Sequence, residues 1–271
     1  QSANPLVEGN YFGVLRHGAP GSTYKSRSSG EIFRYNYVEA SSRAIDWVYS
    51  EEQTPGIATQ PDYGTDYAYG NIIVNDCGLG RCAGSPIHYG GDNEGEQENT
   101  ETLFVPVTPY RSHLYFYNNT VMMRTNRHEM WRTSVFDLSE RSTRVDAWNN
   151  IFYFGGDSNY QWVSQAGNLN LHGKNLAFGT VRESDERALE INYSVNVSGT
   201  LLTSDPHFED PDTLDCRPGS GSSAISQATG LPGGIVHDGS YMDVPVIQQP
   251  GLGTNGLVPR TAFDLGAIES E

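Results

Sequence analysis

A short pattern of one polar position and at least two apolar positions recurs between residues 10 and 175. In each copy an asparagine comes before an apolar pair, except that Thr120-Val121 follows Asn119, and the asparagines are Asn10, Asn36, Asn71, Asn119, Asn150 and Asn175. The steps between them are 26, 35, 48, 31 and 25 residues. A base step near 25 residues with insertions is typical of a solenoid, in which each coil buries the apolar face of its neighbour.

We expect each of these asparagines to lie in a left-handed turn at the start of a strand, with its side-chain amide bonded to the asparagine of the next coil. The alternative is a chance recurrence of asparagine–apolar pairs in a chain rich in asparagine. The longer steps place insertions at 46–70 and 75–110, and insertions on one side of a solenoid usually build its binding face.

The same pattern divides the chain into two parts of one domain. Coils are expected over 1–202, and the Gly-, Pro- and Ser-rich segment 203–271 is expected to pack back on them as a tail. The one short helix that the pattern predicts covers 183–190.

Composition and charge exclude several classes of partner. The chain has 16 Tyr, 10 Phe and 30 Gly, which favours strands joined by turns. Its formal net charge of -16 would repel nucleic acid and anionic membranes. No apolar run approaches the roughly 20 residues that span a bilayer, so we expect no membrane insertion. A soluble, secreted or cell-surface protein whose export signal has been removed is the resulting expectation.

Three cysteines allow at most one bridge within the chain. Cys77 and Cys82 lie five residues apart in a Gly-rich stretch, and we expect them to form a disulfide that closes this loop. The alternative is two thiols. The spacing of cysteines and histidines gives little support to a zinc, haem or thioredoxin-like site.

The closing part of the chain carries a recognisable series of motifs. They are Asp205-Pro206-His207-Phe208-Glu209-Asp210, Arg217-Pro218-Gly219-Ser220-Gly221-Ser222-Ser223-Ala224-Ile225 and Asp264-Leu265-Gly266-Ala267-Ile268-Glu269. This series resembles the end of right-handed parallel β-helix proteins of the pectate-lyase-like superfamily, although Ser223 and Ser226 stand where Pro and Asp are usual. The resemblance implies an all-β, right-handed parallel β-helix and says nothing about activity.

A second stretch, from Asn10-Tyr11-Phe12-Gly13 to Tyr24-Lys25-Ser26-Arg27, resembles exported β-helix proteins with polysaccharide-lyase-like sequences. Such proteins normally have further coils and a cap before this pattern. The resemblance therefore implies that the sequence is the carboxyl-terminal portion of a longer protein, or that a neighbouring chain covers its first coil.

The distribution of charge suggests where a ligand would bind. Residues 16–43 and 111–144 are each locally basic, and the segment 45–110 between them is strongly acidic. A basic stretch on an acidic protein suggests an anionic ligand, and carboxylated polysaccharides are the usual ligand of the superfamily. The alternative is that the arginines neutralise the acidic segment in ordinary surface networks.

β-Elimination on a uronic acid needs a base, a cation that neutralises the carboxylate and a proton donor. Lys25-Ser26 resembles the Lys-Ser that carries the base in polysaccharide lyase family six. We therefore name Lys25 as the base and Arg27 or Arg43 as the carboxylate clamp, with His17 and Tyr24 as proton donors in reserve.

That family places two glutamates before the lysine to hold calcium, and Gly18 and Pro20 stand here instead. Lys25 would otherwise be structural, with its ammonium paired to Asp46 or Glu39. The remaining substrate-binding candidates are Arg16, Tyr24, Tyr89, His88 and Arg111.

An acidic loop offers the one metal site that the sequence suggests. Asp92, Glu94 and Glu96, with Glu98 after them, could supply the oxygen ligands that calcium prefers. A solvated acidic loop is the alternative, and no cofactor is otherwise expected.

Two functions follow from this reading. The first is a secreted protein that binds an acidic polysaccharide and, as an enzyme, cleaves it as a lyase. The second is a non-catalytic structural or adhesive protein that assembles by end-to-end stacking of its coils.

Overall fold

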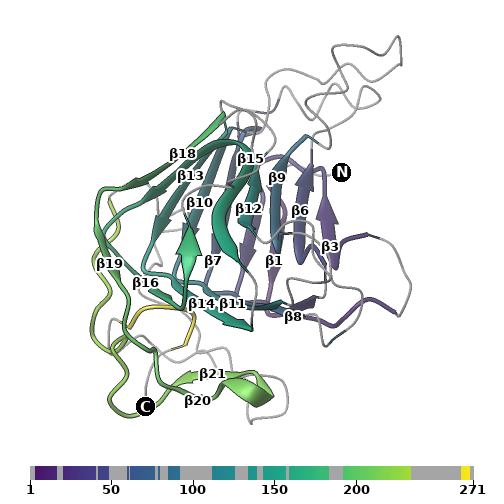
Figure 1. Cartoon of the computed structure of the whole chain (residues 1–271). Coiled ribbons are helices and arrows are strands. Elements are labelled where there is room, and N and C mark those ends of the chain that lie inside the picture. The colour runs from purple at the N-terminus through teal and green to yellow at the C-terminus, as the bar shows by residue number, and fades with distance from the viewer. Residues whose placement is uncertain are drawn as a thin grey trace.

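Three parallel sheets wind around a single core in the computed structural model (Figure 1). The structure describes residues 4–16, 21–40, 42–48, 60, 62–76, 79, 85–91, 112–125, 134–138, 143–156, 159–182, 192–232 and 264–268. Each coil contributes one strand to each sheet in turn, and every strand pairs in parallel with the strand of the next coil. The predicted parallel β-helix is therefore confirmed.

We number the sheets by the order in which each coil passes through them. The first sheet contains β1 (Leu6–Glu8), β4 (Ile32–Arg34), β7 (Thr65–Tyr69), β10 (His113–Tyr117), β13 (Arg144–Trp148), the second half of β15 (Tyr160–Leu171) and β18 (Asn192–Val197). The second sheet contains β2 (Tyr11–Phe12), β5 (Tyr37–Ala40), β8 (Ile72–Asp76), β11 (Thr120–Thr125), β14 (Ile151–Gly156), β16 (Lys174–Phe178) and β19 (Thr200–Leu202). The third sheet contains β3 (Tyr24–Ser26), β6 (Ile45–Val48), β9 (Ile87–Gly90), β12 (Ser134–Leu138), the first half of β15 and β17 (Val181–Arg182).

The strand β15 turns the corner between the third sheet and the first. Gln165 and Gly167 have φ values of 72° and 85°, which bend the strand between its two halves. A Cβ atom at Gly167 would lie 2.9 Å from the side chain of Leu138, so the corner also needs the small residue. The first and third sheets thereby join into one continuous 12-stranded sheet.

Apolar side chains from all three sheets fill the interior. Phe116 of the first sheet lies 5.3 Å from Phe136 of the third, and Phe152 of the second lies 5.0 Å from Trp162. These distances between ring centroids are typical of edge-to-face packing. Alternate residues of each strand point into this core, which leaves the other set to form the outer faces of the sheets.

A ladder of asparagines runs along the turn between the first and second sheets. The backbone N–H of Asn36 donates to Oδ1 of Asn71 at 2.9 Å, and that of Asn71 donates to Oδ1 of Asn119 at 3.0 Å. The same pattern links the predicted residues from Asn10 to Asn175. Chance recurrence is thus excluded, because one asparagine per coil occupies the same place in each.

The left-handed backbone conformation predicted for the ladder asparagines is found instead at the residue before most of them. Positive φ values occur at Gly9, Tyr35, Gly70, Asn118 and Asn149, each directly before a ladder asparagine. The ladder asparagines are not among the residues with positive φ, and all but Asn175 lie directly before the first residue of a strand in the second sheet. The expectation was therefore wrong by one residue.

The tail covers the outer face of the second sheet. Its buried side chains pack on outward-facing residues such as Ile72, Met122 and Ile151, and they are Phe208, Cys216, Ala224, Leu265, Ala267 and Ile268. An antiparallel pair, β20 (Phe208–Asp210) and β21 (Asp215–Pro218), flanks the short 3-10 helix η2 (Pro211–Thr213).

The last described motif of the tail is fixed by close backbone contacts. Gly266 donates its N–H to the carbonyl of Asn149 at 2.8 Å, and a Cβ atom there would lie 2.6 Å from Oγ1 of Thr120. Asp264 is fully buried and accepts from the N–H of Ser226 at 2.7 Å. The Asp-x-Gly-Ala motif therefore docks the tail on the coils.

Candidate functional site

The longest connections of the solenoid all adjoin the third sheet. Residues 49–64 and 91–112 leave it toward the first sheet, and residues 77–86 and 126–133 enter it from the second. The turns between the first and second sheets, by contrast, are as short as residues 118–119 and 149–150. Since insertions on one side of a solenoid usually build its binding face, the third sheet is the first place to search for a site.

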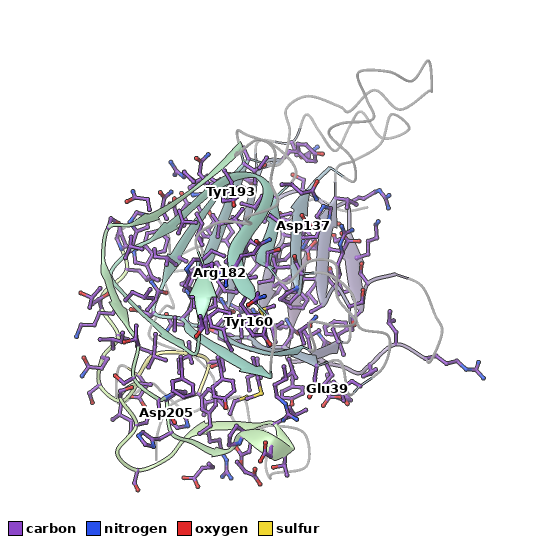
Figure 2. The ribbon with its side chains drawn as sticks, viewed as in Figure 1. Glu39, Asp137, Tyr160, Arg182, Tyr193 and Asp205 are labelled. Carbon is purple, nitrogen blue, oxygen red and sulfur yellow. The ribbon has the colours of Figure 1, made fainter. Side chains whose placement is uncertain are left out.

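A row of polar side chains crosses the outer face of this sheet. The strand registers place Lys25 beside Asp46, Asp46 beside His88, and His88 beside Asp137, whose other neighbour is Ser164. Asp46, His88 and Asp137 each lie between two residues that point into the core, such as Ile45 and Trp47 around Asp46. Figure 2 labels Asp137 in this sheet, with Arg182 on β17 beyond it.

Asp46 contacts several polar side chains around it. Its carboxylate is 2.6 Å from Nδ1 of His88 and 3.2 Å from Nζ of Lys25, and it accepts from Oγ of Ser22 at 2.7 Å. Burial opposes its ionisation, but the contacts with His88, Ser22 and Lys25 outweigh burial and hold the pKa of Asp46 well below its usual range. Asp46 therefore carries a permanent negative charge beneath Lys25 and the neighbouring Arg43.

Arg43 ties the two buried carboxylates together. Its guanidinium is 3.6 Å from Asp46 and 3.2 Å from Asp137. Asp137 also accepts from Oγ of Ser164 at 2.9 Å and from the side-chain amide of Gln165 at 2.5 Å. The carboxylates thus hold Arg43 in place across three strands of the sheet.

The two cations of this network, Lys25 and Arg43, reach the surface. The side chains of Lys25 and Arg43 are 38% and 28% exposed, whereas those of Asp46 and His88 are 2% and 0% exposed. His88 lies between Asp46 and the carbonyl of Gly91, with Nε2 3.1 Å from that oxygen. A ligand on this face would meet the ammonium and guanidinium groups rather than the acids or the imidazole.

The structure brings together some of the residues that the sequence suggested. Lys25 and Arg43 share Asp46, which is the structural pairing weighed above as the alternative to base catalysis. Glu39, the other proposed partner of Lys25, instead accepts from the hydroxyl of Tyr11. Arg16 is exposed before β3 and Arg27 is half-buried directly after it.

Three substrate-binding candidates have side chains that a ligand on the outer face would not reach. Tyr24 points into the core, with its ring 4.9 Å from that of Phe33. Tyr89 is fully buried and donates its hydroxyl to Asp66 at 2.8 Å. The predictions for Tyr24 and Tyr89 were therefore wrong, because the alternation of the strand turns both side chains inward. The third candidate, His88, points outward from the sheet but is fully buried.

The other candidates lie outside the described residues. They are His17, Arg111, the calcium candidates Asp92, Glu94 and Glu96, the cysteines Cys77 and Cys82, and the helix expected at 183–190. In the parts of the chain that the structure does describe, no group of three or more His, Cys, Asp or Glu side chains could hold a metal ion.

Aromatic side chains on the outer face of the first sheet stack on one another. The ring centroids of Tyr69 and Tyr117 are 4.6 Å apart, and those of Tyr67 and Tyr115 are 5.2 Å apart. A ring whose faces are covered by its neighbours in the stack presents mainly its edge and hydroxyl to a ligand. These tyrosines stabilise the stacking of the coils.

Sequence reasoning missed the roles of Asp137 and Ser164, which complete the row. Asp137 lies between the apolar residues Phe136 and Leu138, and that alternation is the signal that could have identified it, whereas Ser164 is followed by the polar Gln165 and gives a weaker signal. Within the part of the chain that the structure describes, no helix is long and apolar enough to cross a membrane. Comparisons with known proteins add nothing further, since no family model, no curated protein and no solved structure matches this chain.

Proposed function

We propose that the outer face of the third sheet binds an acidic polysaccharide, with Lys25 and Arg43 as the groups that contact its carboxylates. The observation that carries this proposal is the arrangement of two partly exposed cations anchored by two buried acids. Fixed cations lose less side-chain entropy when an anion binds, which favours the complex. The longest connections of the solenoid lead into or out of strands of the same sheet, which supports this choice of face.

The proposal includes membership of the pectate-lyase-like β-helix proteins and an extracellular location. The docking of the Asp-x-Gly-Ala motif on the coils supports the membership, because it gives this motif a structural role in a parallel β-helix. Acidic polysaccharides are found outside cells or on their surfaces, which supports the location.

The contact between Lys25 and Asp46 makes binding the preferred function over cleavage. A lysine that acts as a base needs a neighbourhood of cations, and Lys25 instead contacts the buried carboxylate of Asp46. The described geometry thus favours an ammonium that attracts a sugar carboxylate over an amine that removes a proton.

The test measures binding of alginate, pectate and chondroitin sulfate, with neutral dextran as the control polymer. Lys25→Ala and Arg43→Ala should each weaken binding of at least one acidic polymer about threefold to tenfold, as expected for a partly exposed ion pair. Arg217→Ala is the matched control, since Arg217 is 44% exposed and pairs with Asp215 on the tail. It should leave affinity unchanged.

The same samples decide between binding and lyase action. An unsaturated product that absorbs in the ultraviolet, formed by the wild type and lost in Lys25→Ala, would establish the lyase. Binding without product would establish a binding module. Equal affinity for acidic polymers and dextran, or equal loss in all three variants, would refute the proposal.

The structural or adhesive function remains the second candidate because of one observation. Among the described residues, the large apolar side chains that are exposed lie at the two ends of the solenoid: Leu6 and Tyr11 in the first coil and Val197 on β18. End-to-end stacking would bury them. Light scattering across a range of protein concentrations tests this, with growing assemblies in favour and a constant monomer mass against.

A further inference from the structure

A second polar cluster lies on the outer face of the first sheet, around Asp146 on β13. Oδ1 of Asp146 accepts from Nε2 of His172 at 3.0 Å and from the amide of Asn170 at 2.8 Å. Oδ2 accepts from Nε2 of His113 at 2.6 Å and from Nε of Arg144 at 2.9 Å. Four donors from three strands and one turn therefore converge on one carboxylate.

These contacts keep Asp146 ionised. Burial opposes its ionisation, but the hydrogen bonds from His113, His172 and Asn170 outweigh that effect and hold the pKa of Asp146 well below its usual range. A permanent carboxylate at Nε2 fixes the hydrogen of His172 on that nitrogen. The opposite nitrogen, Nδ1, is then left with a lone pair.

That lone pair faces a serine hydroxyl. Oγ of Ser198, in the turn after β18, is 2.8 Å from Nδ1 of His172 and 3.4 Å from the carbonyl of Leu171, so the imidazole is its better acceptor. Ser198 is exposed and the His172 side chain is 31% exposed, whereas that of Asp146 is 7% exposed. Tyr193, labelled in Figure 2, marks the strand that leads to Ser198.

We propose that Ser198, His172 and Asp146 form a nucleophile–base–carboxylate triad that hydrolyses esters. A serine within hydrogen-bond reach of a base, which a third group orients, is the arrangement that activates a hydroxyl. Such a triad is recognised by the roles of its residues and not by their order along the chain, and here Nδ1 of His172 faces the serine while Nε2 faces the carboxylate, the reverse of the serine-protease arrangement. The triad and the polysaccharide face lie on different sheets, so neither proposal depends on the other.

The surroundings narrow the class of ester. Ser194 and Asn196 are exposed on β18, and Asn170 lies half-buried beside the triad, so the described surface around Ser198 is mainly polar, with Val197 as its exposed apolar side chain. The ring of Trp148 stacks on His172 with centroids 4.6 Å apart, which holds the imidazole in place. A short acyl group, such as acetyl, on a hydrophilic alcohol fits these features.

The reaction proceeds in two balanced steps. Oγ of Ser198 bonds to the ester carbonyl carbon while its proton passes to Nδ1 of His172, and the bond to the alcohol oxygen then breaks as that proton is returned to the leaving alkoxide. Water attacks the acyl-serine, gives a proton to His172 and releases the acid, while Ser198 recovers its proton from His172. Asp146 stays ionised and stabilises the imidazolium that forms in each step.

The test combines covalent labelling with hydrolysis of p-nitrophenyl acetate. A fluorophosphonate should label the wild type, with the adduct mapped by mass spectrometry to the peptide that contains Ser198. Ser198→Ala should remove the label and lower the hydrolysis rate at least about a hundredfold. Ser194→Ala is the matched control, because Ser194 is an exposed serine on the same strand whose Oγ donates to Asn168 and not to a histidine.

A second pair of variants separates the triad from folding. His172→Ala should lose both the label and the activity, whereas His113→Ala, which removes the other histidine on Asp146, should keep the label on Ser198. Circular dichroism of both variants serves as the control that they fold. The absence of any adduct on Ser198 in the wild type, or a Ser198→Ala variant that hydrolyses the ester at the wild-type rate, would overturn the proposal.

Discussion

Replacement of Asn71 by alanine tests how much the asparagine ladder stabilises the solenoid. The side chain is fully buried, donates to the carbonyl of Phe33 at 2.9 Å and to Oδ1 of Asn119 at 2.9 Å, and accepts two hydrogen bonds from Asn36. Each such bond contributes about 1 kcal/mol net, and a buried partner left unpaired costs more. We expect Asn71→Ala to lower the free energy of unfolding by about 3 to 5 kcal/mol.

The assay is urea unfolding followed by tryptophan fluorescence, with the free energy obtained by linear extrapolation. Asn196→Ala is the matched control, because Asn196 is exposed on β18 and its loss should change the free energy by no more than about 0.5 kcal/mol. If Asn71→Ala unfolds within about 1 kcal/mol of the wild type, the ladder is not a main source of stability and the reasoning fails.

Three further predictions concern backbone strain, acid and a buried thiol. Gly9 and Gly70 share φ values of 66° and 65°, but a Cβ atom meets nothing within 4 Å at Gly9 and lies 2.4 Å from the ring of Tyr35 at Gly70. In urea unfolding, Gly9→Ala should therefore cost about 1 kcal/mol and Gly70→Ala clearly more, and equal costs would contradict the packing at Tyr35. The lowered pKa values of Asp46 and Asp146 give stability that is complete above the unfolded pKa near 3.9 and is lost as the pH falls toward their folded values. The urea concentration at the unfolding midpoint should accordingly drop below about pH 4, and it should drop less steeply in Asp146→Asn than in the wild type. If the midpoints of the two proteins fall in parallel with pH, that result would count against a role for Asp146. Burial raises the pKa of the Cys216 thiol far above its usual range, so iodoacetamide should modify Cys216 only after denaturant is added, as mass mapping of the peptide would show. Rapid modification in the folded protein would contradict the docking of the tail.

The fold could be predicted from the sequence because one feature repeats once per coil. Each ladder asparagine bonds to the asparagine of the next coil, so the chain needs that residue at every passage through the turn. The requirement appears in the sequence whatever the length of the insertion between two coils. The tail could be anticipated for a similar reason, since Gly266 must be a glycine where it approaches Thr120.

The candidate site was only partly predictable. Asp46, His88 and Asp137 become neighbours through strand register, and their separation in the sequence is set by insertions that carry no register information. Lys25 and Arg43 were found through a resemblance and through local charge, but the acids that hold them were not assigned to a site. Tyrosines were hard to assign for another reason, because a shift of one position along a strand separates the inward Tyr89 from an outward residue such as His88.

Hydrogen–deuterium exchange with and without the best-binding acidic polysaccharide tests the central claim about the third sheet most directly. We expect added protection in the segments around β3 and β6, which carry Lys25 and Arg43, and in β12, which carries Asp137. Dextran should cause no change. Protection that appears instead on β10 and β13 of the first sheet, or no protection with any acidic polymer that binds, would contradict the claim.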